Sequence, residues 1–135
     1  MNLVSVRVIT DDVARLVAFY ERVTGGSATW STPDFAELVT TSGTLAIGST
    51  RTVGLFGPGS AEAGANRSAI LEFIVPDVDA EFARLRTWIG EFVTEPTTMP
   101  WGNRALLFRD PDGTLVNLFT PVSDDAVTKF AATPR

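Results

Sequence analysis

The side chains that can do chemistry in this sequence are few, because histidine and cysteine are both absent. The chain thus lacks the commonest general base, thiolate nucleophiles, disulfides and sulfur-based zinc sites. Serine-hydrolase triads and Cys–His pairs are excluded as well. The chemistry that remains belongs to carboxylates, guanidinium groups and amides. Three such groups interrupt apolar segments: Arg7 in LVSVRVI, Glu72 in AILEFIV and Asn117 in TLVNLF.

The elements that must position these groups occur twice. Residues 3–9 and 69–75 have the alternation and β-branched content typical of strands. After each strand an aspartate, Asp12 or Asp77, predicts a helix N-cap. Apolar residues at helical spacing then run up to Gly25 and Gly90. The two segments match at a shift of 65 residues.

Each copy continues into a hairpin, at Ser42-Gly43 and at Asp112-Gly113, which match at a shift of 70. The repeat predicts an α+β fold of two tandem βαβββ modules in one domain, residues 1–135. We expect module one at about 1–52, a connector at about 53–68, module two at about 69–122 and a tail at 123–135. The Gly-, Ala- and Ser-rich connector is either a flexible link or a flap with Phe56 at its tip. In the tail we expect a short helix capped by Ser123.

Composition argues against two classes of partner. A net charge of −5 disfavours nucleic acid, whose phosphates need a basic surface. The sequence has no run of about 18 apolar residues, so it predicts no membrane span. Apolar residues make up 44% and charged residues 20%, as in soluble globular proteins, and the first residues do not look like a secretory signal. We therefore expect a cytoplasmic protein.

Two motifs, DVARLVAFY at 12–20 and PWGNR…DPDG at 100–113, join the repeat in a wider resemblance. Together they resemble the vicinal oxygen chelate superfamily, which holds glyoxalases, extradiol dioxygenases, fosfomycin-resistance enzymes and bleomycin-resistance proteins. The resemblance covers nearly the whole chain. It implies that each module curls a mixed sheet into half of a cup, with the helices on the outer face.

The resemblance also implies where a metal would be bound. Metal-dependent members place one ligand on a module's first strand, seven residues before the capping aspartate, and another four residues after the turn glycine. These positions hold Ser5 and Ile70 on the first strands, and Ile47 and Asn117 on the last. None is a usual metal ligand. We expect no metal and no cofactor.

The period of two along a strand predicts which neighbours share the cup face. Arg7 lies with Ser5, Glu72 lies with Ile70, and Phe119 lies with Asn117. Arg7 and Glu72 occupy equivalent places in the two modules. They form either an internal salt bridge or two sides of a polar ligand site, where Glu72 can also serve as an acid or base.

Aromatic residues complete the predicted site. Trp30, expected in the second strand, and Trp101, before the third strand of module two, either clamp a flat ligand or pack at a sheet edge or dimer contact. Phe56 and Arg104 are further candidates, although Arg104 also belongs to the turn motif and can be structural.

The function predicted is metal-free binding and sequestration of a small, partly aromatic or cationic molecule, similar to bleomycin-resistance proteins. A homodimer is implied by the same resemblance. The alternative is a lyase or dioxygenase-type enzyme that uses Glu72 or an atypical metal site. A third possibility is an interaction module whose cup is filled by its own side chains.

Overall fold

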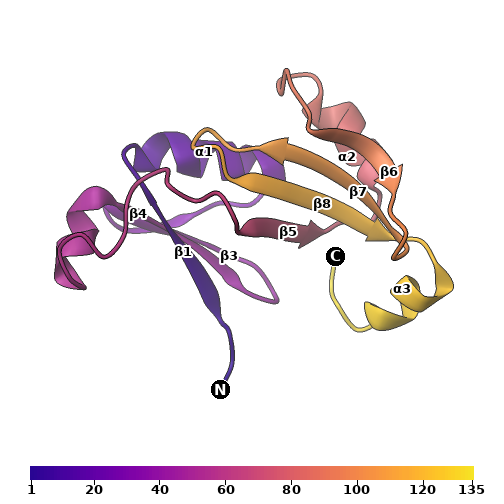
Figure 1. Ribbon diagram of the computed structural model, residues 1–135, viewed down its shortest axis with the longest axis horizontal. Coiled ribbons are helices and arrows are strands. Elements are labelled where there is room, and N and C mark those ends of the chain that lie inside the picture. Colours follow the sequence, from indigo (N-terminus) through magenta and orange to yellow (C-terminus); the bar gives the residue numbers. More distant parts are fainter. The chain divides into compact units, whose positions relative to one another are not determined.

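The computed structural model describes residues 1–135, which divide into two units (Figure 1). Unit 1 comprises Met1–Arg67 and Asp110–Gly113, and unit 2 comprises Ser68–Arg109 and Thr114–Arg135. Each unit holds one four-stranded mixed sheet and a helix that follows the first strand. The prediction of an α+β fold built from two βαβββ modules is confirmed.

Unit 1 has the strand order β1-β4-β3-β2, with β1 parallel to β4 and the other neighbours antiparallel. A 3₁₀ helix, η1, follows β4. The elements are β1 (Ser5–Thr10), α1 (Val13–Thr24), β2 (Thr29–Thr32), β3 (Phe35–Val39), β4 (Thr44–Ser49) and η1 (Thr50–Leu55).

Helix α1 begins and ends where its capping residues require. The Asp12 carboxylate accepts a hydrogen bond from the Arg15 backbone N–H at 3.0 Å, which satisfies one free donor of the first turn. Gly25 ends the helix in the left-handed conformation, with φ of 74°. The stripe between these caps packs on β3 and β4 and is buried: Val13, Leu16, Val17, Tyr20 and Val23.

Unit 2 repeats the arrangement with the order β5-β8-β7-β6, in which β5 runs parallel to β8. Helix α2 packs against β6, β7 and β8. The elements are β5 (Ile70–Ile74), α2 (Val78–Leu85), β6 (Thr94–Thr98), β7 (Asn103–Arg109), β8 (Leu115–Pro121) and α3 (Asp124–Lys129).

Helix α2 is shorter than the apolar spacing predicts. Asp77 caps it as expected, through hydrogen bonds from the N–H groups of Asp79 and Ala80. The helix ends at Leu85 rather than near Gly90. Trp88 and Ile89 still donate their N–H groups to the Leu85 carbonyl, so the chain makes one tight turn there.

The predicted tail helix is confirmed as α3, which follows the end of β8 (Figure 1). Ser123 caps it by accepting a hydrogen bond from Ala126 N at 3.1 Å. The Gly102 carbonyl accepts the N–H groups of Val122 and Ser123. Gly102 lies in the turn before β7, so this turn holds the start of the tail. No helix of the chain has the length and apolar character needed to cross a membrane.

Candidate functional site

Glu72 and Asn117 are partners across the parallel strands β5 and β8. Asn117 Nδ2 donates a 2.7 Å hydrogen bond to Glu72 Oε2. Asn117 Oδ1 is buried and accepts no hydrogen bond within the chain, whereas Glu72 is exposed. A buried acceptor without a donor is costly. The pair therefore presents the exposed Glu72 carboxylate, which favours a ligand that donates hydrogen bonds, while Asn117 holds that carboxylate in place.

The face around this pair is open at one end and covered at the other. Ile70, on the same face of β5, is exposed. Phe119, two residues after Asn117, is buried, and its ring lies 5.2 Å from that of Phe130. Phe130 directly follows α3. The tail thus covers the Phe119 end of the face, a contact that the sequence did not predict.

In unit 1, Arg7 lies on β1 with its guanidinium over two aromatic rings. The Arg7 Cζ atom is 4.5 Å from the centroid of Phe35 and 5.0 Å from that of Phe56. Phe56 follows η1 and is 71% exposed. Ser5, two residues before Arg7 on the same face, is exposed. Within unit 1 the structure thus brings Phe56 to Arg7, while the role of the connector as a flap stays a prediction.

The predicted salt bridge between Arg7 and Glu72 joins residues of different units and stays a prediction. The structure describes each residue within its own unit. Glu72 is held by Asn117, and Arg7 is held by Phe35 and Phe56.

The register predicted for Ile47 is wrong by one residue. Ile47 pairs with Val8, and it is Ala46 that pairs with Arg7. Because Glu72 pairs with Asn117 in unit 2, the counterpart of Asn117 in unit 1 is Ala46. Ile47 points to the α1 side of the sheet and is only 1% exposed. Its side chain belongs to the core.

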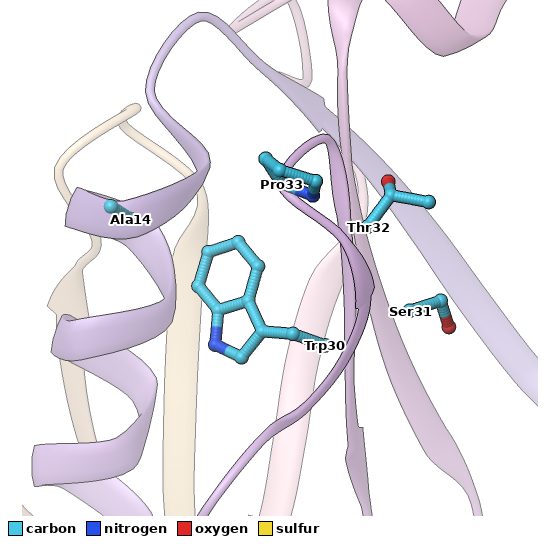
Figure 2. Close-up of a pocket in the computed structure, with 5 residues that line it drawn as sticks. All are labelled: Ala14, Trp30, Ser31, Thr32 and Pro33. Atoms are coloured by element: carbon cyan, nitrogen blue, oxygen red, sulfur yellow. The ribbon is translucent and has the colours of Figure 1, made fainter.

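Trp30 also lies on the α1 side of its sheet, and not on the face of Arg7. It pairs with Ala36, which in turn pairs with the core residue Ile47. A shallow pocket of about 540 Å³ surrounds its indole, which is 43% exposed. Figure 2 shows the indole projecting toward Ala14 of α1, with Pro33 beside it. The pocket is lined by Ala14, Trp30, Ser31, Thr32 and Pro33.

Arg104 lies on the helix side of the unit 2 sheet. It shares that side with Leu106 and Phe108, because side chains alternate along β7. Its Nε and Nη2 atoms donate to the two carboxylate oxygens of Asp79, in the first turn of α2, at 2.7 and 2.8 Å. These hydrogen bonds lower the pKa of Asp79 and raise the pKa of Arg104. Arg104 thus links β7 to the first turn of α2, which agrees with the structural role that the sequence also allowed for it.

Replacing Arg104 by glutamine is expected to leave ligand binding unchanged and to lower Tm only slightly. The pair with Asp79 is exposed, and exposed ion pairs contribute little and are screened by salt. Melting curves at low and high salt, with Asp79→Asn as the matched variant, measure the effect. Loss of ligand binding in the Arg104→Gln protein would contradict this assignment.

Trp101 occupies the turn between β6 and β7 and is 67% exposed. The turn is closed by hydrogen bonds from Gly102 N to Met99 O and from Met99 N to Asn103 O. Its indole is accessible, and its role as a clamp or a dimer contact stays a prediction.

The sequence matches the model of the Glyoxalase/Bleomycin resistance protein/Dioxygenase superfamily over residues 2–118. The chain belongs to this superfamily. The resemblance inferred from the motifs and the repeat is confirmed. No curated protein matches the chain significantly.

Several solved structures have the same fold. A glyoxalase/bleomycin resistance protein/dioxygenase from Nocardioides is 23% identical, with a TM-score of 0.75 over 92% of this chain and 85% of that one. A family enzyme from Burkholderia phytofirmans PsJN is 18% identical, with a TM-score of 0.79 over 90% of this chain and 100% of that one. A virulence protein from Salmonella typhimurium is 23% identical, with a TM-score of 0.72 over 90% and 98%. At these identities the likeness shows the fold.

The residues at the expected metal positions do not fit a metal ion. Ile70 and Ala46 have no donor atom, Ser5 offers a neutral hydroxyl, and Asn117 is already hydrogen-bonded to Glu72. Nowhere do three His, Cys, Asp or Glu side chains gather into a group that could hold an ion. A divalent ion needs several converging N, O⁻ or S donors, and these four positions do not supply them.

Phe35 is the site residue that sequence reasoning missed. It lies on β3 opposite Gly48, two residues along β4 from Ala46, and its ring contacts the Arg7 guanidinium. The alternation in FAELV places Phe35 on one face and the buried Ala36 on the other. That pattern could have assigned Phe35 to the Arg7 face, given the correct register of β4.

Proposed function

We propose that this protein binds and sequesters a small, partly aromatic molecule without the help of a metal ion. The observation that carries the proposal is the Glu72–Asn117 pair. Where metal-dependent relatives are expected to place a ligand, Asn117 instead donates to Glu72 and orients its exposed carboxylate. The Glu72 carboxylate can accept a hydrogen bond from a donor group of a small-molecule ligand.

The chemistry of the face indicates the kind of guest. Glu72 supplies a negative charge, and the chain as a whole carries a net charge of −5, which favours a cationic or hydrogen-bond-donating group. Ile70, Leu107 and Leu115 share the face and offer apolar contact. A planar molecule with an amine or amidine group matches both features.

We also propose a homodimer, as in the bleomycin-resistance type, where two chains pair. Support comes from exposed apolar residues, which include Val4, Val6 and Trp101. Large exposed apolar side chains are often covered in an assembly. Analytical ultracentrifugation of the purified protein measures the state directly, and a monomer at the concentrations used for binding would contradict it.

The test of the proposed function combines metal analysis with a binding titration. Quenching of tryptophan fluorescence by a panel of planar cationic drugs is expected to saturate in metal-free protein. Glu72→Gln is expected to weaken the binding by about tenfold or more, because it removes a charged acceptor. Glu91→Gln, which loses the same charge in the segment between α2 and β6, serves as the matched control.

Two results would contradict the proposal. Stoichiometric metal that resists dialysis would show that the chain builds a metal site after all. Equal affinities in the Glu72→Gln and Glu91→Gln proteins would remove Glu72 from the binding site.

The exposed Glu72 carboxylate also supports a second candidate, an enzyme in which Glu72 moves a proton. Asn117 Nδ2 fixes one carboxylate oxygen at 2.7 Å, which would orient the other toward a substrate. Turnover of glyoxalase- or dioxygenase-type substrates with added divalent metal, lost in Glu72→Gln while binding is retained, would favour the enzyme. Unchanged turnover in that variant would eliminate Glu72 from the mechanism.

A further inference from the structure

Arg7 is a cation that two aromatic rings hold in place. Its guanidinium lies over Phe35 at 4.5 Å and over Phe56 at 5.0 Å. Arginine stacks readily on aromatic rings, and such contacts restrict an otherwise flexible side chain. Arg7 and Phe56 are both exposed, so a molecule from solution can reach the guanidinium.

The N–H donors of Arg7 are not used by unit 1. None of the hydrogen bonds within the unit starts from its guanidinium, and the ion pair of unit 1 joins other residues. Asp34 accepts from Arg51 at 2.8 Å and from Ser49 at 2.9 Å. The hydrogen bond from Arg51 is the main reason that the pKa of Asp34 is lowered.

Glu37 is the other acidic group on this face of the sheet. It lies on β3 and pairs with Ala46, which in turn pairs with Arg7, so a whole strand separates the two charges. No ion pair forms between Glu37 and Arg7. The charge of Arg7 therefore has aromatic contacts but no anionic partner within its unit.

We propose that Arg7, with Phe56 beside it, forms a site in unit 1 that binds the carboxylate group of a small aromatic molecule. A guanidinium binds a carboxylate through two parallel N–H···O hydrogen bonds, and these are among the stronger hydrogen bonds in proteins. The exposed ring of Phe56 adds apolar contact for an aromatic body next to that carboxylate. This inference rests on the proposed small-molecule binding and adds carboxylates to the chemical classes that the protein would take.

The test uses benzoate as the probe and the Arg7 side chain as the reporter. In protein labelled with ¹⁵N-arginine, the Nε–H signal of Arg7 is assigned by its loss in Arg7→Lys. Added benzoate is expected to shift that signal with a saturating dependence. Arg7→Gln is expected to weaken benzoate binding by about tenfold. Phe56→Leu, a change at an exposed position, is expected to weaken it several-fold because the guanidinium loses one restraint.

Arg15→Gln is the matched control, since Arg15 is an exposed residue of α1 on the other side of the sheet. It removes the same charge and is expected to bind benzoate like the wild type. Equal benzoate affinity in the Arg7→Gln and Arg15→Gln proteins would overturn the proposal. Benzoate binding that appears only in Glu72→Gln would also overturn it, because Arg7 would then be occupied by Glu72.

The planar-cation titration, repeated on the same variants, separates this inference from the proposed function. If planar cations bind saturably but benzoate does not shift the Arg7 signal, the carboxylate anchor is overturned and the proposed function stands. A saturating Arg7 shift without any cation binding would support the anchor while contradicting the cationic guest.

Discussion

Replacing Gly102 by alanine is expected to lower the free energy of unfolding by about 3 kcal/mol and to release α3 from the sheet. Gly102 has a φ of 91°, and positive φ at a residue with a side chain costs about 1–3 kcal/mol. The added Cβ would also lie 2.6 Å from Ser123 Cβ and closer still to Ser123 Oγ. Neither distance is compatible with ordinary contact.

The clash cannot be relieved by a simple side-chain rotation. The Gly102 carbonyl accepts the N–H groups of Val122 and Ser123, so the backbone of the tail is held against the same glycine. Moving Ser123 away breaks those hydrogen bonds and disturbs the cap of α3. We expect the tail to detach and Phe119 to lose its contact with Phe130.

Urea denaturation measures the stability, and hydrogen exchange of the α3 amides measures the release of the tail. Gly90→Ala is the matched control, because a Cβ there would meet no atom within 4 Å and its φ is not positive. Similar stability and exchange in the two variants would contradict the expectation.

Replacing Tyr20 by phenylalanine is expected to lower the free energy of unfolding by about 1–3 kcal/mol. The Tyr20 hydroxyl donates a 2.6 Å hydrogen bond to Asp110 Oδ2, and both residues are buried. Phenylalanine keeps the ring and its packing against Phe19 but leaves the carboxylate without this donor. The cost is therefore that of a buried acceptor that loses a partner.

The same residue makes stability depend on alkaline pH. Burial, more than the nearby Asp110 carboxylate, raises the pKa of Tyr20 above its ordinary value of 10.0. Above that value an unfolded chain releases the phenolic proton while the folded protein retains it. Stability is thus fully present below pH 10.0 and falls as the pH rises further, by up to about 1.4 kcal/mol per pH unit.

Urea denaturation from neutral pH into this alkaline range checks the sign. Tyr20 is the single tyrosine of the chain, so the Tyr20→Phe protein should lose the tyrosine contribution to the slope. An identical alkaline slope in both proteins would show that other groups cause it.

Local chemistry accounts for most of what the sequence predicted correctly. Asp12, Asp77 and Ser123 each cap the helix expected of them, because a short polar side chain before an apolar stripe satisfies free N–H groups wherever it occurs. Gly113, with φ of 88°, turns the second hairpin as expected. None of these features depends on distant parts of the chain.

The errors arose where strand register depends on loop length. Residues 40–43 join β3 to β4, whereas residues 110–114 join β7 to β8, so the second loop is one residue longer. Matching the two turn glycines therefore misplaced Ile47 by one position. Since side chains alternate, this small slip moved it to the opposite face of the sheet.

Trp30 and Arg104 are candidates for the cup by residue type and motif rather than by register, and each also has a structural alternative. An irregularity in the pairing of β2 with β3 lies next to Trp30. The β2 sequence, TWST, contains no signal that would predict such a bulge. Arg104 was placed by its motif, but alternation along β7 directs it toward Asp79. Phe35 was missed because its face follows from its pairing with β4, whose register was misplaced by one residue.

The turn that contains Asp110 has a consequence for the order of folding. Strands β7 and β8 belong to unit 2, yet Asp110–Gly113 between them belongs to unit 1. The hydroxyl of Tyr20 meets a partner that lies 90 residues later in the chain. During synthesis, unit 1 cannot complete its interior until the hairpin of the second module has left the ribosome. Such distant pairing slows folding, so we expect unit 1 to reach its final packing only after residues 110–113 are available.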